Sequence, residues 1–380
     1  MALTPLRLAC VPRADVLAGG LTDQHFAAQL DKIVRDPEHY PVYGDADEFF
    51  AVTYPTTGLQ ALLLKTFGRV SGARGLAGEN GVLRPTTSFG GGKTHGLTAV
   101  YHLAKGARPV NLNEFVDLRV LPDRPVPVAA LVGDALDPVS GLATNGHRSH
   151  TLWGEMAAQL GDHAWATLAA NDLERSAPGT HTLREAFGGQ PTIVIIDEIA
   201  KYLRQVTSSG SEDVRRMAGA IPAFLGNLFE VATDPSSRVV AIITLAATTN
   251  AFGTETDELS DLLDEATEAA NQSLAETADL LIRPGGGSAV ITPAEDNEIG
   301  EILKRRLFAD ISETAAKDAG DAYRSLYEGL AAKGEQLAGG AEHPITYSEQ
   351  VARTYPFHLM TAPKETRGNK RPCNRPWYSR

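Results

Sequence analysis

The sequence predicts a three-layer α/β core built around a mainly parallel sheet. Three short apolar runs rich in β-branched residues, 126–132, 191–196 and 238–245, are separated by helix-like stretches. Such runs are typical of strands buried on both faces of a parallel sheet, since crossover helices cover both sides. Two further observations support this class: a glycine-rich segment at 87–95 lies between a strand-like and a helix-like stretch, and two adjacent carboxylates follow the run 191–196.

The first 80 residues predict a helical N-terminal extension. Apolar residues recur at helical spacing in two of its stretches, 23–34 and 57–70. Its expected elements are an irregular segment at 1–50 with one helix at 23–34, an aromatic and proline cluster between Tyr40 and Tyr54 that packs on the core, an amphipathic helix at 57–70 and a glycine-containing loop at 71–80.

The glycine-rich segment T-S-F-G-G-G-K-T-H, residues 87–95, is predicted to bind the phosphates of a nucleotide. It ends a strand expected at 81–89 and leads into a helix expected at 96–105. Backbone N–H groups of such a turn can surround a polyphosphate. Lys93 would neutralise the β- and γ-phosphate oxygens, and the Thr94 hydroxyl would complete the coordination of Mg²⁺. The expected nucleotide-binding residues are Phe89, Gly90, Gly91, Gly92, Lys93, Thr94 and His95.

The segment departs from the usual G-x-x-x-x-G-K-[ST] pattern, because Thr87 stands where glycine is expected. Three consecutive glycines before the lysine keep the freedom to adopt positive φ and to bring the backbone close to an anion. Taken alone, the segment is also compatible with an ordinary surface turn.

The run 191–196 ends in Asp197 and Glu198. Ligands of open α/β sheets bind beyond the carboxyl ends of the strands, where these two acids are expected. Asp197 would hold Mg²⁺ through water, and Glu198 would orient and deprotonate an attacking water. A solvated strand end is the alternative, but the order and spacing relative to the glycine-rich segment favour the functional interpretation.

A polar residue after the third run is expected to sense the γ-phosphate. In ATPases with an additional strand between the phosphate loop and the acidic strand, a polar residue stands at this position. Thr244 and Asn250 are candidate catalytic residues for this role, Thr248 and Thr249 are further candidates, and each is equally compatible with a turn residue.

The remaining segments are expected to connect or cover the core. Three arginines, Arg283, Arg305 and Arg306, are candidates for reaching the transferred phosphoryl group, with surface placement as the alternative. Asp134 is expected to be a helix cap or a ligand contact. A polar loop is expected at 138–150, and its residues His147 and His150 lack further metal ligands. The other expected elements are helices from Thr151, at 199–205 and at 214–233, a linker at 207–212, a solvated helix at 255–281, a short strand at 289–293 and a helix at 297–308.

Composition limits the class of protein. With 380 residues, 43% apolar and 22% charged, the chain can form one large core with appendages. A net charge of −12 argues against a broad nucleic-acid-binding surface. Cys10 and Cys373 have no metal-ligand spacing and indicate a reducing, cytoplasmic location. No apolar run approaches the roughly twenty residues of a membrane span, and the N-terminus lacks the pattern of a secretory signal.

An ordered set of motifs resembles a known family. The set comprises 53–59 (T-Y-P-T-T-G-L), 88–95, 101–104, 152–155 (L-W-G-E), 196–198, Pro293 with 301–308, and 355–358 (Y-P-F-H). It is similar to large prokaryotic P-loop ATPases that resemble the AAA+ class, carry a domain-of-unknown-function label and are often encoded beside DNA methyltransferases and helicases in anti-phage defence islands. The resemblance implies ATP and Mg²⁺ as ligands, and hydrolysis by Lys93, Thr94, Asp197 and Glu198.

The resemblance also implies an organisation and partners. We expect a P-loop ATPase core at 81–310, the start of a helical lid at 311–358 and a disordered tail at 359–380. Members of this family are usually longer, so the proline- and arginine-rich tail is expected to close a truncated product in which nucleotide binding would outlast turnover. Implied partners are DNA, DNA-modification or helicase proteins of a defence system and, by analogy of fold, further copies of the chain.

The expected function is a Mg-dependent ATPase that couples hydrolysis to a conformational change in a DNA-related or anti-phage defence complex. One alternative is a scaffold that binds nucleotide without hydrolysing it, or an inactive fragment. A small-molecule kinase that uses the same loop is a third, weaker alternative, because adjacent Asp197 and Glu198 suit the activation of water better than transfer to a hydroxyl.

Overall fold

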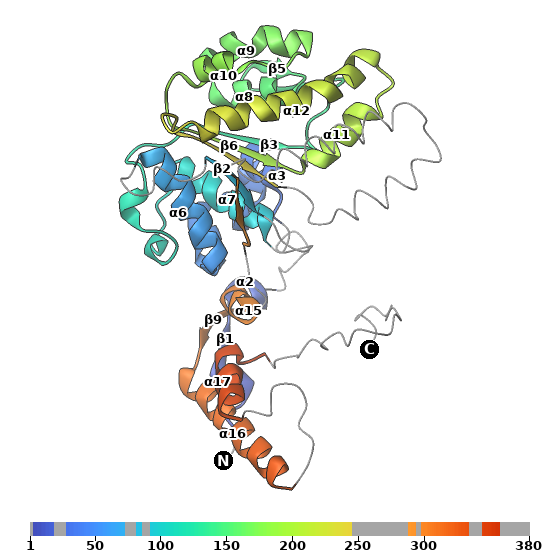
Figure 1. The fold of residues 1–380 in the computed structure, drawn as a ribbon. Helices are drawn as coiled ribbons and strands as arrows, with labels where there is room; N and C mark the ends of the chain where they lie inside the picture. The colour runs from blue at the N-terminus through green and yellow to red at the C-terminus, as the bar shows by residue number, and fades with distance from the viewer. Residues whose placement is uncertain are drawn as a thin grey trace. The chain divides into compact units, whose positions relative to one another are not determined.

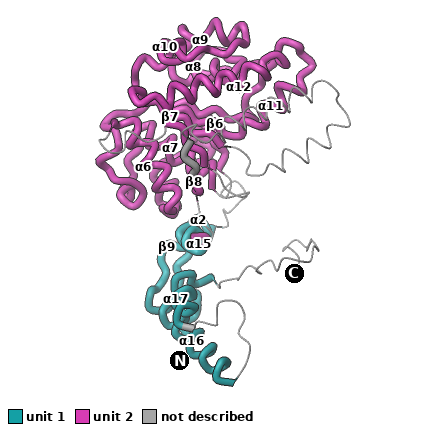
Figure 2. The backbone as a smooth tube through the Cα atoms, viewed as in Figure 1, with its two compact units in different colours: residues 1–20, 300–380 teal, residues 21–299 magenta. Residues whose placement is uncertain are grey.

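A computed structural model describes residues 3–18, 28–72, 81–85, 92–244, 288–293, 298–333 and 344–357. Contacts divide the chain into two compact units, one formed by residues 1–20 with 300–380 and the other by residues 21–299 (Figure 2). The domain boundaries predicted at 1–80, 81–310, 311–358 and 359–380 stay predictions. The loop at 73–80, the strand residues 86–89, the helix at 255–281 and the tail from 358 lie outside the described residues.

A five-stranded sheet forms the centre of the larger unit (Figure 1). All its pairings are parallel, and the strand order is β3-β6-β7-β2-β8. The order agrees with the predicted additional strand, because β7 lies between β2, which precedes the glycine-rich segment, and β6, which ends in the acidic pair. The strands are β2 (Val82–Pro85), β3 (Val128–Val132), β6 (Thr192–Asp197), β7 (Val239–Ile243) and β8 (Ser288–Ile291).

The two faces of this sheet pack into separate hydrophobic clusters. Along β6, Ile193 and Ile195 belong to one cluster, and Val194 and Ile196 belong to the other. This alternation follows from the twofold period of a strand and explains why residues 193–196 are all apolar. The sheet is therefore the middle of three layers, and the predicted three-layer α/β fold is confirmed.

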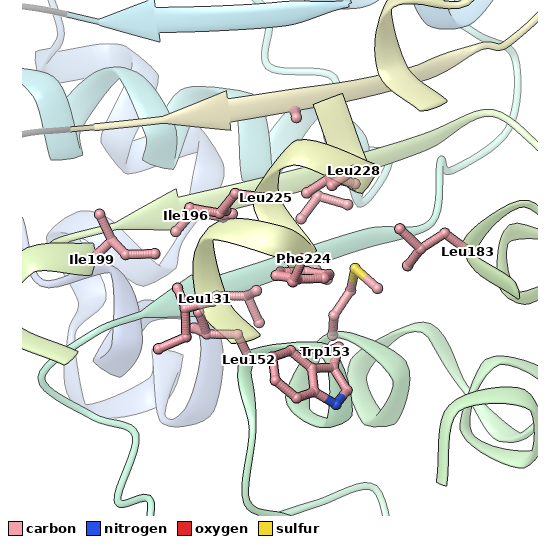
Figure 3. Packing of buried hydrophobic residues seen from close by; sticks show 14 of the residues in the cluster. Leu131, Leu152, Trp153, Leu183, Ile196, Ile199, Phe224, Leu225 and Leu228 are labelled. Carbon is pink, nitrogen blue, oxygen red and sulfur yellow. The ribbon is translucent and has the colours of Figure 1, made fainter. Parts of the chain in front are cut away.

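Helices from different parts of the sequence cover the two faces (Figure 1). One cluster joins the sheet to a layer that includes Trp153 and Phe224, both fully buried (Figure 3). The other joins it to the helices of the N-terminal region and the helix that follows the glycine-rich segment. The first layer contains α8 (Leu152–Leu160), α9 (Asp162–Glu174), α10 (Thr180–Phe187), α11 (Ile199–Thr207) and α12 (Glu212–Thr233), and the second contains α3 (Leu30–Arg35), α4 (Pro41–Gly44), α5 (Ala46–Val52), α6 (Thr57–Ser71) and α7 (Lys93–Ala104), with short 3₁₀ turns at Pro37–His39, Leu112–Glu114 and Leu118–Val120.

Local signals set several helix ends. The Thr56 hydroxyl accepts the Leu59 N–H and starts α6, and Gly72 at φ +69° follows its last residue. Thr151 caps α8 in the same way by accepting the Gly154 N–H. Both helices were predicted, but α7 begins at Lys93, three residues before the expected start at 96.

The polar loop predicted at 138–150 contains a β-hairpin, so that prediction was wrong. Strands β4 (Leu142–Thr144) and β5 (His147–Ser149) pair antiparallel across Asn145 and Gly146. Both turn residues have positive φ, 50° and 83°, and Asn-Gly is the preferred sequence for such a two-residue hairpin turn. The strands are too short for a visible alternation, and the turn dipeptide was the signal that sequence reasoning overlooked.

The smaller unit joins the two ends of the chain. Strand β1 pairs antiparallel with β9, with Cys10 opposite Ile311, and Cys10 is buried. Residues 1–50 are thus not irregular apart from one helix, as predicted, because a three-residue strand whose partner lies far along the sequence leaves no local pattern. The unit contains α1 (Leu6–Ala9), β1 (Cys10–Pro12), α2 (Ala14–Leu17), nearly all of α15 (Ile299–Leu307), β9 (Phe308–Ile311), α16 (Glu313–Ala332) and α17 (Pro344–Thr354).

Candidate functional site

The candidate site lies where β6 and β7 end beside the first turn of α7. Asp197, the last residue of β6, accepts a hydrogen bond from the Thr94 hydroxyl at 3.0 Å through Oδ2. Its other oxygen, Oδ1, accepts a hydrogen bond from the Thr244 hydroxyl, directly after β7. The parallel register places Ile196 opposite Ile243, so that the two strand ends are level. Asp197 thus contacts two other predicted site residues, Thr94 and Thr244, which are themselves 150 positions apart in the sequence.

Asp197 is almost completely buried, with 3% of its surface exposed. Burial raises the pKa of its carboxyl, because removal from water penalises the charged form. The hydroxyls of Thr244 and Thr94, the backbone N–H of Glu198 and the charge of Lys93 each lower this pKa, but they do not fully offset burial. A buried carboxyl with this balance is suited to a bound cation, which would stabilise its charged form.

The described part of the glycine-rich segment continues directly into α7. Gly92 adopts φ +80° and serves as the N-cap, which leaves Lys93, Thr94 and His95 in the first helical turn. The N–H groups of a first turn point away from the helix and, with the helix dipole, favour an anion. A side chain at Gly92 would meet no neighbouring atom, so its glycine is explained by the positive φ alone. Phe89, Gly90 and Gly91 lie outside the described residues.

His95 has packing partners in the N-terminal region. Its Nε2 lies 2.9 Å from the Thr53 hydroxyl, and its ring is 4.6 Å from that of Phe49 and edge-on to Tyr43. The aromatic cluster therefore packs on the core, as expected, and holds the start of α7. A nucleotide contact by His95 stays a prediction.

Glu198 follows Asp197 and begins α11. It adopts φ +54° and ψ 36°, a left-handed conformation that is uncommon for a residue other than glycine. The chain is closely packed here: the Gly133 N–H donates to the Asp197 carbonyl at 2.9 Å, and a Cβ on Gly133 would lie 2.2 Å from the Glu198 carbonyl oxygen. The backbone of Glu198 is therefore fixed by its surroundings.

The Glu198 side chain is part of a group of three charges. Lys201 Nζ lies 2.5 Å from Glu198 Oε2 and 3.3 Å from Asp134 Oδ2, and all three side chains are between 38% and 49% exposed. Burial raises the pKa of Glu198, the Lys201 ammonium lowers it, and the charges of Asp134 and Asp197 raise it further. Asp134 thus pairs with Lys201, and its predicted contact with a ligand stays a prediction.

The other predicted residues are not brought to this site by the structure as described. Asn250, Thr248, Thr249 and Arg283 lie outside the described residues. Arg305 and Arg306 are in the last turn of α15, in the smaller unit. Their predicted contact with a γ-phosphate stays a prediction.

Comparison with protein families identifies the chain. Residues 11–276 match the model of the DUF499 N-terminal domain, a range that contains the glycine-rich segment, the acidic pair and Thr244. The chain belongs to this family. Comparisons with curated proteins and with solved structures give no match. The membership agrees with the expected resemblance to a family with a domain-of-unknown-function label.

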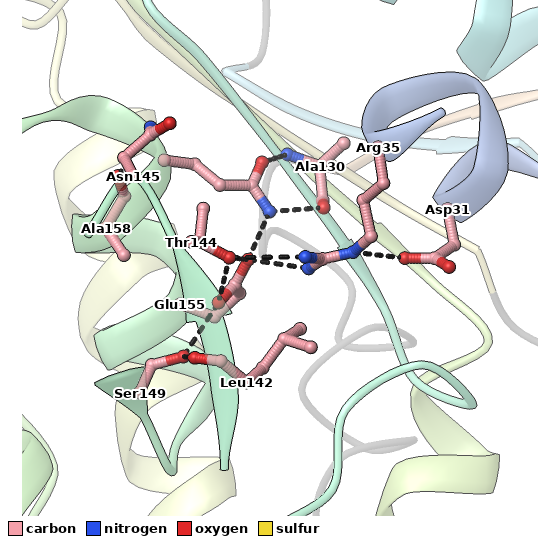
Figure 4. Close-up of polar contacts among 10 residues, drawn as sticks. Asp31, Arg35, Ala130, Leu142, Thr144, Asn145, Ser149, Glu155 and Ala158 are labelled. Carbon is pink, nitrogen blue, oxygen red and sulfur yellow. Dashed lines mark hydrogen bonds and ion pairs between the residues drawn. The ribbon is translucent and has the colours of Figure 1, made fainter. Parts of the chain in front are cut away.

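A second polar group in this DUF499 domain has a structural role (Figure 4). The buried Glu155 carboxylate of α8 accepts hydrogen bonds from Arg35 at 2.9 Å and from Ser149 at 2.7 Å. Gln159, one turn further, bonds to Glu155 and to both backbone groups of Ala130 on β3, the terminal strand of the sheet. These contacts pair the backbone N–H and C=O of Ala130 at the edge of β3. The Arg35–Glu155 contact also joins α3 to α8.

The L-W-G-E motif at 152–155 is explained by the same region. Leu152 and Trp153 are core residues, and Glu155 is the centre of the polar group. A Cβ on Gly154 would lie 1.9 Å from an oxygen of the buried Asp172, which accepts the backbone N–H groups of His150 and Thr151. Each residue of the motif thus has a role in packing or in a buried hydrogen-bond group.

Sequence reasoning missed two residues of the site in this domain. Lys201 stands one helical turn after Glu198, and the i, i+3 spacing of opposite charges was the available signal. Gly133 is recognisable only from its tertiary contact. Within the described ranges, no group of three or more His, Cys, Asp or Glu side chains is arranged to hold a metal ion, and no helix is long and apolar enough to span a bilayer.

Proposed function

We propose that this DUF499 domain binds ATP with Mg²⁺ and hydrolyses it. The observation that carries the proposal is the contact of Asp197 with Thr94 and Thr244, beside the Gly92-Lys93 start of α7. A carboxylate and a hydroxyl at hydrogen-bonding distance, next to a helix N-terminus and a lysine, form a set of groups that suits a metal-bound triphosphate.

Each residue has a defined task in this proposal. Lys93 and the N–H groups of the first turn of α7 bind the β- and γ-phosphate oxygens. Thr94 and Asp197 would hold the magnesium ion, which would neutralise part of the phosphate charge. Thr244 orients the Asp197 carboxylate through its hydrogen bond.

Glu198 receives the proton of the attacking water. Its carboxylate is partly buried, and Glu198 directly follows Asp197 at the end of β6 that would hold the metal, where a general base for the attacking water would be needed. The backbone on both sides of this residue is held by Gly133 and by α11, which limits the positions that the side chain can take.

The wider role is proposed from the family resemblance. Hydrolysis would drive a conformational change in a complex that acts on DNA in anti-phage defence, with DNA, DNA-modification proteins, helicases or further copies of the chain as partners. Because the net charge is −12, contact with DNA would use a local basic surface or a partner protein. A scaffold that binds nucleotide without hydrolysing it is the competing function.

Two measurements on the purified chain test the proposal. Calorimetry with Mg·ATP is expected to show binding that Lys93→Ala weakens at least about tenfold, because a charge-assisted contact is lost. Lys105→Ala, at the exposed opposite end of α7, is the matched control. Absence of Mg·ATP binding by the wild-type chain would refute the proposal.

Phosphate release, with and without DNA, then separates hydrolysis from binding alone. Glu198→Gln is expected to keep ATP affinity and to lose about 10²–10⁴-fold in turnover, the usual contribution of a general base. Glu212→Gln, an exposed residue at the start of α12, should leave turnover unchanged. ATP binding without phosphate release under any condition would favour the scaffold, and normal turnover by Glu198→Gln would refute the role of Glu198.

A further inference from the structure

Three acidic residues stand at the ends of two neighbouring strands. Asp134 follows β3, and Asp197 and Glu198 end and follow β6, the strand that pairs with β3. Val132 is opposite Asp197 in the register, which brings the following residues of both strands to the same edge. Asp134 and Asp197 both act on Glu198 as like charges. Repulsion would turn the flexible Glu198 side chain away from the site unless a cation held it.

Lys201 is the cation that holds two of these carboxylates. Its ammonium is 2.5 Å from Glu198 Oε2 and 3.3 Å from Asp134 Oδ2, and it therefore connects the ends of β3 and β6. The stem of Lys201 starts from a rigid helix, because Ile199, Tyr202 and Leu203 on either side of it are buried in the core. The packing of α11 thus fixes the point from which the Lys201 side chain extends, and the two ion pairs hold its ammonium.

We propose that Lys201 is a positioning residue for Glu198. Together with Asp134, it keeps the Glu198 carboxylate at the strand ends, on the side of Asp197, and acts on hydrolysis only through Glu198. This inference rests on the proposed function and adds a residue to it. A partly exposed ion pair contributes little to folding, so its removal is expected to change catalysis and not the fold.

Steady-state phosphate release by the full chain tests the proposal. Lys201→Ala is expected to lower kcat about tenfold or more, because a reacting group that is displaced by about 1 Å loses up to about 10²-fold in rate. The affinity for Mg·ATP measured by calorimetry should stay within about threefold. Lys201→Arg, which keeps a cation that can reach both carboxylates, should recover most of kcat.

A matched control and a double variant separate positioning from general damage. Arg216→Ala removes an exposed ion pair between residues one turn apart on the neighbouring helix α12 and should not affect kcat. In a Glu198→Gln background, Lys201→Ala should cause no further loss, because its effect passes through Glu198. Far-UV circular dichroism and thermal unfolding verify the fold, and Lys201→Met replaces Lys201→Ala if the latter does not fold.

The outcomes distinguish this inference from the function on which it rests. If the wild-type chain hydrolyses ATP and the kcat of Lys201→Ala is unchanged or increased, the positioning role is overturned and ATP hydrolysis as the function is not. A loss that persists in the Glu198→Gln background also overturns it, because Lys201 would then act by another route. A wild-type chain that binds ATP and releases no phosphate overturns hydrolysis and this role together.

Discussion

Gly133→Ala tests whether the close approach of β3 to the start of α11 is needed for the site. The new Cβ would lie 2.2 Å from the Glu198 carbonyl oxygen and 3.2 Å from Tyr202 Cβ. Tyr202 is fully buried and cannot move aside. Restoring an ordinary carbon–oxygen contact requires a displacement of about 1 Å between the two chain segments.

This displacement has two calculable consequences. Overpacking of a buried position costs about 1–3 kcal/mol in the free energy of unfolding. A shift of about 1 Å at the backbone of Glu198 is expected to reduce turnover by about 10²-fold, if Glu198 activates water. Stability and activity should therefore fall together, whereas Lys201→Ala is expected to affect activity alone.

Chemical denaturation and phosphate release measure the two effects. Gly226→Ala is the matched control, because a Cβ at this position of α12 meets no atom within 4 Å and alanine favours a helix by up to about 1 kcal/mol. A Gly133→Ala chain with wild-type stability and turnover would show that the strand end yields without cost, and the argument from close packing would be wrong.

Two further predictions concern stability. Glu155→Ala removes the carboxylate that pairs with Arg35 and is expected to cost about 3 kcal/mol by chemical denaturation, near the low end for a buried pair because Arg35 is 27% exposed. Asp31→Ala, which removes a partner of the same guanidinium at the surface, should cost less than about 1 kcal/mol, and equal losses would contradict a special role for the buried contact. Burial lowers the pKa of His102, whose ring bonds to the Tyr43 carbonyl. Below about pH 6.5 this histidine therefore binds a proton more readily in the unfolded chain than in the folded chain, and the free energy of unfolding decreases as pH falls. The stability difference between wild type and His102→Gln should therefore narrow between pH 7 and pH 5 in denaturation experiments, and a difference independent of pH would rule out this linkage.

Much of the core was predictable because its signals are local. The runs that form β3, β6 and β7 are apolar without interruption, since both faces of each strand are buried. Helices α6 and α8 carry their own capping residues, Thr56 and Thr151. Asp197 and Thr94 were predicted to share a metal because each stands at a recognisable position next to a strand or a glycine-rich turn, and their contact at 3.0 Å agrees with that grouping.

Other features left no local pattern. The pairing of β1 with β9 depends on residues about three hundred positions apart, and each strand has only three or four residues. The hairpin at 142–149 was hidden in a polar stretch whose turn dipeptide was the single clue. The place of Glu155 at the centre of a buried polar group could not be predicted, because its partners come from α3, β4 and β5 as well as its own helix.

The amino-acid sequence by itself determined which segments form the central sheet, where the glycine-rich segment and the acidic pair lie along the chain, and the class of fold that contains them. These properties depend on neighbouring residues and on the period of burial. The tertiary structure alone decided that Lys201 contacts Asp134 as well as Glu198, that Gly133 must lack a side chain and that His95 packs against Phe49. Such contacts join residues whose separation in the sequence is unrelated to their distance in space, and only the packing of strands and helices brings them together.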